Sequence, residues 1–187
     1  MLENIQEKLL FLYKFSRAPK QIGSLTPSSI FLAKKMLEPV KWNRVRHIAE
    51  LGAGTGAITK YIKAANTENA KVLLFEKDTL LRNKLAERFP AYVCYSDACE
   101  LQDALQNEGM DHLDCILSGL PFFNFPQQLR DQLMEQIVIS LRPGGLFIAF
   151  QYSQQMKKQL SSLFEIVEIH YVPLNIPPAF VYVCRKR

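Results

Sequence analysis

From Arg46 onward the sequence alternates short apolar runs with helical segments, and this alternation constrains the fold more than any other feature. The runs are apolar at consecutive positions, which is typical of strands buried on both faces of a sheet. We expect seven such strands, at His47–Leu51, Lys71–Phe75, Ala91–Tyr95, Asp114–Ser118, Leu146–Tyr152, Phe164–Tyr171 and Ala179–Cys184. The last two have no helix between them and are expected to pair antiparallel at one edge. The prediction is an α/β fold with a mostly parallel, seven-stranded sheet and helices on both faces.

The expected helices fill the intervals between the strands. They run from a Gly-rich turn to Ala65, from Thr79 to Phe89, from Pro126 to Leu141, and through a last segment that ends near Leu163. Pro90 and the Arg-Pro-Gly-Gly sequence at 142–145 are strong stop signals for two of them. A further helix is expected near Ala98, and another at Ser28–Leu37 before the first strand.

The chain has 187 residues, of which 48% are hydrophobic and 22% charged, so it can form one well-packed domain. No repeat or flexible linker divides it, and we expect an N-terminal extension at residues 1–45 followed by a main domain at 46–187. No run reaches the length of a membrane span, the start does not resemble a secretory signal, and the four cysteines form no CxxC pair. These features favour a cytoplasmic protein with reduced thiols and no metal site.

The turn after the first strand carries three glycines, Gly52, Gly54 and Gly56, in the spacing GxGxG. Glycine allows a sharp turn and lets the backbone approach a ligand closely. Glu50 lies two residues before the first glycine, where its carboxylate would repel a pyrophosphate but attract a cationic group such as an ammonium. The alternative is a tight turn selected for packing alone.

Acidic residues also follow the next two strands. Glu76 lies 24 residues beyond Gly52, the position where an acid accepts hydrogen bonds from the ribose hydroxyls of a nucleoside cofactor. Asp97 follows the third strand and is placed to accept from an adenine amino group. Each acid can instead be a helix cap, as can Asp78. Three acids at three successive strand ends nevertheless favour a shared binding site.

The fourth strand ends in Ser118-Gly119-Leu120-Pro121-Phe122-Phe123. Gly-Leu-Pro favours a rigid, extended backbone whose carbonyls face the pocket, and the two phenylalanines offer flat faces to a cation. The alternative is a hydrophobic loop that covers the core. This segment and the Pro-rich Val172–Pro178 are also candidates for a lipid groove or a dimer contact.

Residues 46–187 resemble the class I S-adenosylmethionine-dependent methyltransferases, above all in the Glu-x-Gly-x-Gly-x-Gly turn. The resemblance implies a Rossmann-like sheet that binds S-adenosylmethionine. It assigns the methionine end of the cofactor to the turn, the ribose to Glu76, and the adenine to the residues after the second and third strands. The cofactor contacts implied are Glu50, Gly52, Ala53, Gly54, Gly56, Glu76, Lys77, Asp97, Ala98 and Ser118.

A narrower resemblance is to the bacterial phospholipid N-methyltransferases, which methylate phosphatidylethanolamine. The shared blocks, in order, are Ile22–Ser29, Ser118–Pro121, Phe150–Tyr152 and Asn175–Ala179. It implies methyl transfer to a lipid headgroup amine, with Gly23 and Ser24 closing over the cofactor. Positioning is assigned to Ser118, Gly119, Leu120, Pro121 and Tyr152, and substrate contacts to Tyr13, Phe122, Phe123 and Tyr152.

The turn Glu50–Gly56 is also similar to that of the rRNA adenine dimethylases. Those enzymes usually have Asn where this chain has Ser118, and they append a helical RNA-binding domain, whereas this chain stops three residues beyond its last expected strand. An adenine in RNA, or a small amine, is therefore the alternative acceptor. A cofactor-binding protein without activity is a second alternative.

The N-terminal segment is basic and amphipathic. Residues 1–47 contain nine basic and three acidic residues, a net charge of +6. On a helical wheel, Leu2, Ile5, Leu9, Leu12 and Tyr13 form one apolar stripe, accompanied by several cations. Such a helix suits the interface of an anionic membrane, which predicts peripheral membrane association and a phospholipid partner. The alternative is a helix that packs over the cofactor pocket as a lid.

The expected chemistry is in-line displacement, in which an amine attacks only when it is neutral. Desolvation among Phe122, Phe123 and Tyr152 favours the neutral form. No histidine or carboxylate stands out as a general base, so we expect catalysis chiefly by positioning.

Overall fold

The computed structural model describes residues 26–187, with side chains from Ile30 onward. The predicted amphipathic helix at residues 1–20 and the predicted contacts Tyr13, Gly23 and Ser24 lie outside the described residues. None of the described helices is long and apolar enough to cross a bilayer.

Seven strands form one sheet in the order β3-β2-β1-β4-β5-β7-β6. The strands are β1 (His47–Leu51), β2 (Lys71–Phe75), β3 (Val93–Tyr95), β4 (Leu113–Ser118), β5 (Leu141–Gln151), β6 (Glu165–Val172) and β7 (Ala179–Arg185). β7 is antiparallel to both β5 and β6, and the pairs among β1 to β5 are parallel. This confirms the predicted α/β fold and the antiparallel pairing of the last two strands.

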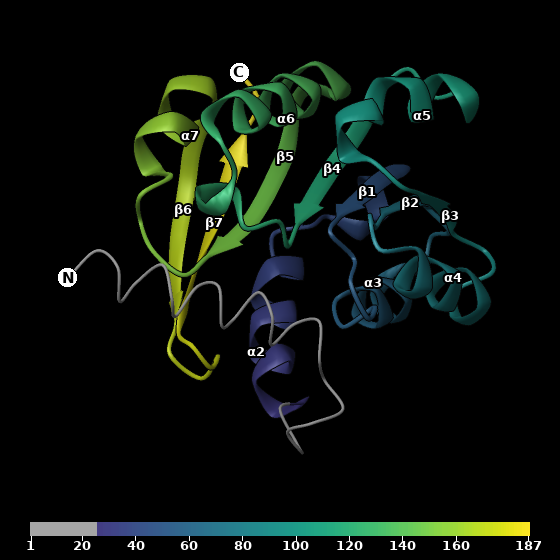
Figure 1. Cartoon of the computed structure of the whole chain (residues 1–187), viewed down its shortest axis with the longest axis horizontal. Helices are drawn as coiled ribbons and strands as arrows, with labels where there is room; N and C mark the ends of the chain where they lie inside the picture. Colours follow the sequence, from purple (N-terminus) through teal and green to yellow (C-terminus); the bar gives the residue numbers. More distant parts are fainter. Residues whose placement is uncertain (1–25) are drawn as a thin grey trace.

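Helices cover both faces of the sheet (Figure 1). They are α2 (Thr26–Leu37), α3 (Thr59–Ala65), α4 (Thr79–Arg88), α5 (Leu101–Asn107), α6 (Gln127–Ser140) and α7 (Lys157–Leu163). Buried side chains of α2, α3 and α4 share one apolar cluster with the sheet, and those of α5, α6 and α7 share a second cluster. Two cores, one on each face, explain why the strands had to be apolar throughout.

The alternation of side chains along each strand divides these cores. In β1, Ala49 and Leu51 pack with the α5–α7 layer, whereas Ile48 packs with the α2–α4 layer. Since successive residues point to opposite faces, a strand between two helical layers needs an apolar residue at nearly every position.

The described part of the predicted extension packs into the same core. Met36 of α2 is fully buried, and α2 contacts β5, β6 and β7. Val40 and Val45, which follow α2, belong to the same apolar cluster. The boundary at residue 45 stays a prediction.

Several expected bounds differ from the structure. β3 is shorter than predicted, and β5 begins at Leu141 because the Arg-Pro-Gly-Gly segment lies within the strand. The pairing of β4 with β5 shifts register at this segment, between Leu113 and Cys115. The helix expected near Ala98 begins as a 3₁₀ turn at Ala98–Glu100 and continues as α5.

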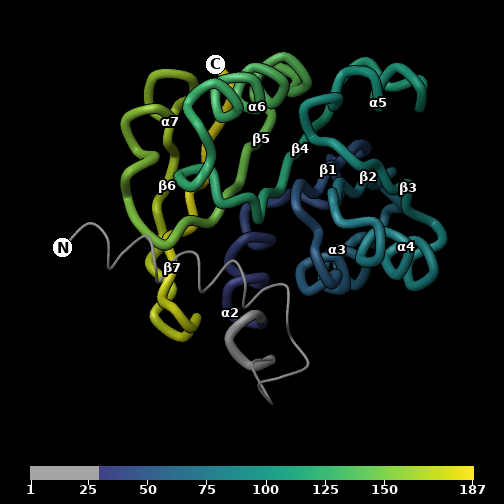
Figure 2. Tube along the Cα trace, viewed as in Figure 1, coloured from purple at the N-terminus to yellow at the C-terminus, as the bar shows by residue number. Residues whose placement is uncertain are grey.

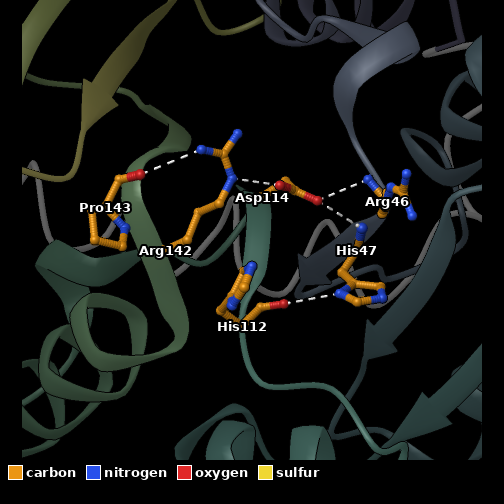
Figure 3. A network of polar contacts seen from close by, with 6 residues as sticks. All are labelled: Arg46, His47, His112, Asp114, Arg142 and Pro143. Atoms are coloured by element: carbon orange, nitrogen blue, oxygen red, sulfur yellow. Dashed lines mark hydrogen bonds and ion pairs between the residues drawn. The ribbon is translucent and has the colours of Figure 1, made fainter.

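A polar network at the start of β4 fixes the amino ends of three central strands (Figure 3). Asp114 Oδ2 accepts hydrogen bonds from the backbone N–H groups of Arg46 (2.8 Å) and His47 (3.0 Å), and Oδ1 pairs with Arg142 Nε at 2.5 Å. Burial acts to raise the pKa of Asp114, but these donors hold it below its ordinary value. His47 Nδ1 lies 3.1 Å from the carbonyl oxygen of His112, so both histidines belong to this structural region.

Candidate functional site

A cavity of about 870 Å³ opens at the carboxyl ends of β1 to β5. This is the place where an open α/β sheet binds its ligands. Of the residues predicted to bind cofactor or substrate, the described ones that line it are Gly52, Gly54, Glu76, Lys77, Asp97, Ala98, Gly119, Leu120, Pro121, Phe123 and Tyr152. The topology therefore brings together residues that are separated by up to a hundred positions in the sequence.

A second cavity, of about 460 Å³, is lined by the segment between α2 and β1 and by residues of β4, β5, β6 and β7. Its wall includes Asp114 and Arg142, which pair with each other, and His170, which pairs with Glu168 at 2.6 Å. None of the described residues that were predicted to bind cofactor or substrate line this cavity, so it is the poorer candidate for the site.

The Gly-rich turn forms the floor of the large cavity. The backbone N–H groups of Gly52 and Ala53 both donate to the carbonyl oxygen of Phe75, at 2.8 and 3.0 Å. Gly54 has φ +57°, and no atom lies within 4 Å of the position that a Cβ would take. A side chain there would therefore project into open space at the cavity, as expected of a cradle for a ligand.

Gly56 has a different role. Its φ is +79°, and a Cβ at this position would lie 2.8 Å from Cε2 of Phe89. Gly56 is buried and is absent from the cavity wall, so packing of the turn on α4 and the segment after it requires this glycine. Ala53 is likewise buried. The predicted contacts of Ala53 and Gly56 with the cofactor stay predictions.

Glu76 connects the ends of β1 and β2. Its Oε2 accepts from the backbone N–H of Gly54 at 2.8 Å, and its Oε1 accepts from Asp78 N–H at 2.9 Å. The helix cap in this region is Asp78, whose carboxylate accepts from Leu80 and Leu81. Glu76 is therefore not the cap of α4, and its half-buried carboxylate faces the cavity beside the open glycine.

Asp97 serves as a cap and also lines the cavity. Its Oδ1 accepts from Cys99 N–H at 2.9 Å, which caps the 3₁₀ turn before α5. A carboxylate has further lone pairs, so capping leaves it able to accept from a ligand. Cys99 lies beside it, and burial raises the pKa of its thiol to about 11.

Glu50 lies beneath the turn rather than on the cavity wall. Its side chain is 1% exposed, and Oε2 accepts from the hydroxyl of Thr59 at 2.6 Å. Burial, with a smaller contribution from the charge of Glu76, raises the pKa of Glu50 to about 8. Its predicted contact with the methionine end of the cofactor stays a prediction. Thr59 was not singled out in the sequence, where it reads as an ordinary residue at the start of a helix.

The segment after β4 divides the cavity. Gly119 N–H donates to the carbonyl oxygen of Leu51 at 2.9 Å, and a Cβ on Gly119 would lie 3.2 Å from the carbonyl oxygen of Gly52. Ser118 is fully buried, and its Oγ accepts from Leu120 N–H at 3.2 Å. Ser118 therefore stabilises the turn after β4 from within the core and does not line the cavity.

Gln151 lies in the Phe150–Tyr152 block of the family resemblance, but the sequence analysis assigned no role to its side chain. Its Nε2 donates to the carbonyl oxygen of Leu120 at 2.9 Å and to that of Phe150 at 2.6 Å. The signal that could have revealed this role is a polar residue at the end of a central strand, and in the structure its side chain is buried.

The two phenylalanines after Pro121 have opposite positions, which corrects the expectation that both face the substrate. Phe123 is exposed and lines the cavity. Phe122 is buried in the core, where its ring contacts Phe125 and Phe147 edge to face. The cause is the short 3₁₀ turn at Phe122–Asn124, which directs one ring inward and the next one outward.

More aromatic residues line this side than were predicted. Tyr152 lies edge to face with Phe150, with ring centroids 5.7 Å apart, and Tyr171 packs on Phe180 at 5.1 Å. These four rings, together with Pro177 and Pro178, form an uncharged wall opposite the acidic one. The segment Val172–Pro178, singled out in the sequence, thus contributes to the cavity.

Comparison with known proteins places this architecture in a family. The model of the methyltransferase small domain matches residues 23–172, which is most of the chain. The chain belongs to this family. The methyltransferase is also 33% identical to an ornithine lipid N-methyltransferase from Singulisphaera acidiphila, over 97% of each chain.

Solved structures share the fold at low identity. A Burkholderia thailandensis 1,6-didemethyltoxoflavin N1-methyltransferase, bound to its substrate and S-adenosylhomocysteine, superposes with a TM-score of 0.70 at 14% identity, covering 98% of this chain and 89% of that one. The N-methyltransferase NodS from Bradyrhizobium japonicum, also with S-adenosylhomocysteine, gives 0.67 at 12% identity, covering 84% and 85%. These comparisons confirm the expected S-adenosylmethionine-dependent methyltransferase with its Rossmann-like sheet.

Proposed function

We propose that this methyltransferase transfers a methyl group from S-adenosylmethionine to the headgroup amine of a membrane lipid, such as phosphatidylethanolamine. The observation that carries the proposal is the division of one cavity into an acidic half and an uncharged aromatic half. A relative that is 33% identical over 97% of the chain and bears the name of a lipid N-methyltransferase supports a lipid acceptor.

The acidic half fits the cofactor. Gly54 leaves space for close approach, Glu76 is placed for the ribose, and Asp97 with Ala98 and Lys77 borders the place of the adenine. S-Adenosylmethionine supplies a methyl group on a sulfonium, which is already a reactive donor. The protein's task is then to align the acceptor and to exclude water.

The aromatic half fits an amine. Phe123, Tyr152 and Tyr171 remove water from a bound amine, and desolvation favours its neutral, attacking form. After transfer the product is a larger cation, which aromatic faces stabilise. The described residues that line this half include no histidine and no carboxylate, so proton loss to water or to a backbone carbonyl is the expected route.

The test is transfer of labelled methyl from S-adenosylmethionine to four acceptors offered separately. They are vesicles containing phosphatidylethanolamine, vesicles containing ornithine lipid, ribosomal RNA and ethanolamine. We expect label in a lipid extract and none in RNA or free ethanolamine, and we expect E76Q to lower the incorporation into lipid. Label in RNA or ethanolamine alone would refute the proposal, and label in ornithine lipid alone would restrict it to that acceptor.

A further inference from the structure

The loop between β6 and β7 has an inverted distribution of polar and apolar side chains. Leu174 is 59% exposed and Ile176 is 72% exposed, whereas Asn175 between them is 5% exposed. Asn175 is held inward because its Nδ2 donates to the carbonyl oxygen of Pro177 at 2.7 Å and its backbone N–H donates to that of Val172. The loop therefore turns its polar side chain into the protein and its two large apolar side chains outward.

The loop also lacks charge. No Asp, Glu, Lys or Arg occurs between Glu168 and Arg185. Figures 1 and 2 show the loop projecting beyond the sheet, at the opposite end of β7 from the C-terminus. Contiguous exposed apolar side chains without charge mark a surface that binds a membrane or another apolar partner.

The exposed side chains border the mouth of the cavity. Tyr171 and Pro177, which flank them in the sequence, both line the cavity, and Tyr171 is itself exposed. Phe123 and Tyr152 are exposed and line it too. The apolar wall of the acceptor half thus continues onto the outer surface of the loop.

We propose that Leu174 and Ile176 insert into the interfacial region of a lipid bilayer, with the cavity mouth against the membrane surface. The inference rests on the proposed function. A cavity of about 870 Å³ is the size of a site for one drug-sized ligand, and here it has to hold the cofactor and a headgroup. The two acyl chains of the lipid must then stay outside, and exposing them to water is strongly unfavourable. A mouth edged with apolar side chains lets the headgroup enter while the acyl chains remain in the bilayer.

The experiment compares the full chain with the double variant L174S/I176S and with I139S. Ile139, on α6, is 49% exposed and does not line the cavity, so I139S removes an exposed apolar side chain at a place away from the cavity mouth. Binding is measured by cosedimentation with neutral phosphatidylcholine vesicles, where electrostatic attraction is minimal. We expect the double variant to bind about tenfold more weakly or worse, and I139S to bind as the wild type does.

A second measurement reports insertion directly. The chain has a single tryptophan, Trp42, so I176W adds a probe at the loop. Bromine-labelled acyl chains should quench the fluorescence of I176W well beyond that of the wild type. Equal quenching, or equal vesicle binding by all variants, would refute the proposal. So would dimerisation of the wild type that L174S/I176S abolishes, because the loop would then bind a second copy.

Activity separates this inference from the proposed function. With a short-chain phosphatidylethanolamine kept monomeric, L174S/I176S should retain wild-type rates, whereas its rate on vesicles should fall in step with binding. Loss of activity on both the monomeric lipid and the vesicles would show that the loop shapes the site and does not bind the membrane. If the wild type methylates neither lipid but its binding to vesicles still requires the loop, the docking stands and the proposed function fails.

Discussion

Replacing Glu50 with glutamine should remove a large part of the pH dependence of this protein's stability. Glu50 is buried beneath the Gly-rich turn, and burial raises its pKa to about 8 from the ordinary value of 4.5. Between these two values the folded protein keeps a proton that the unfolded chain has lost. The contribution of Glu50 to the free energy of unfolding is therefore at its maximum below pH 4.5. It decreases as the pH rises and is lost once the pH has passed through 8.

The size of the effect follows from the shift. Each pH unit in this interval lowers the free energy of unfolding by about 1.4 kcal/mol, which gives a total of roughly 5 kcal/mol. Glutamine has the same shape and can still accept from the Thr59 hydroxyl, but it does not titrate. Its second amide hydrogen has no counterpart in the protonated acid, which adds a constant cost of about 1–2 kcal/mol. We therefore expect E50Q to be less stable than the wild type at pH 5 and more stable at pH 8.

Thermal unfolding of the cofactor-free protein at pH 5, 6, 7 and 8 measures this crossing. Between pH 5 and pH 8 the contribution of Glu50 falls by about 3.5 kcal/mol of the total, which for a domain of this size corresponds to a fall in Tm of roughly 7–14 °C for the wild type relative to E50Q. The variant E87Q is the control, because Glu87 is an exposed glutamate on α4. Its profile should parallel that of the wild type. Parallel profiles for E50Q and the wild type would mean that Glu50 is ionised in the folded protein and that the reasoning is wrong.

Three other predictions test the site and its support. G54A should weaken S-adenosylhomocysteine binding in calorimetry and lower the free energy of unfolding by only about 1–2 kcal/mol, whereas G56A, where a Cβ meets Phe89, should lower the free energy of unfolding by about 2–4 kcal/mol. Equal effects of the two variants on binding and on stability would contradict their separate roles. E76Q should weaken binding of the same ligand at least about tenfold, because a charged acceptor is lost, and unchanged affinity would remove Glu76 from the site. D114A should lower the free energy of unfolding, measured with urea, by about 2–4 kcal/mol without changing ligand affinity. This difference from the wild type should shrink as the pH falls below about 4, because the pKa of Asp114 is lowered in the folded protein.

The fold was predictable because its decisive signal is local. A strand between two helical layers needs apolar residues at consecutive positions, and the strands expected at His47–Leu51 and Lys71–Phe75 match the structure residue for residue. Errors occur where tertiary pairing overrides local preference. The Arg-Pro-Gly-Gly segment has the composition of a turn, yet hydrogen bonds to Lys186 help to hold it as the start of β5.

The site was predictable where function depends on the backbone and less so where it depends on the direction of a side chain. Gly54 and Glu76 occupy fixed positions after strands, so their places followed from topology. Phe122 and Phe123 are chemically identical neighbours, and only the 3₁₀ turn decides which ring enters the core. The roles of Thr59 and Gln151 depend on partners 9 and 31 residues away, which a reading of local patterns does not reveal.

Leu120 lies between the acidic half and the aromatic half of the cavity and connects the elements that carry them. A Cβ on Gly52 would lie 2.9 Å from Cδ2 of Leu120, so this side chain packs directly on the cofactor turn. Its carbonyl oxygen is held by Gln151 at the end of β5, and its N–H by Ser118. One residue is thus fixed to β1, β4 and β5 together. The proposed transfer by alignment needs donor and acceptor at a constant separation, and these contacts fix the segment between the two halves of the cavity to three strands.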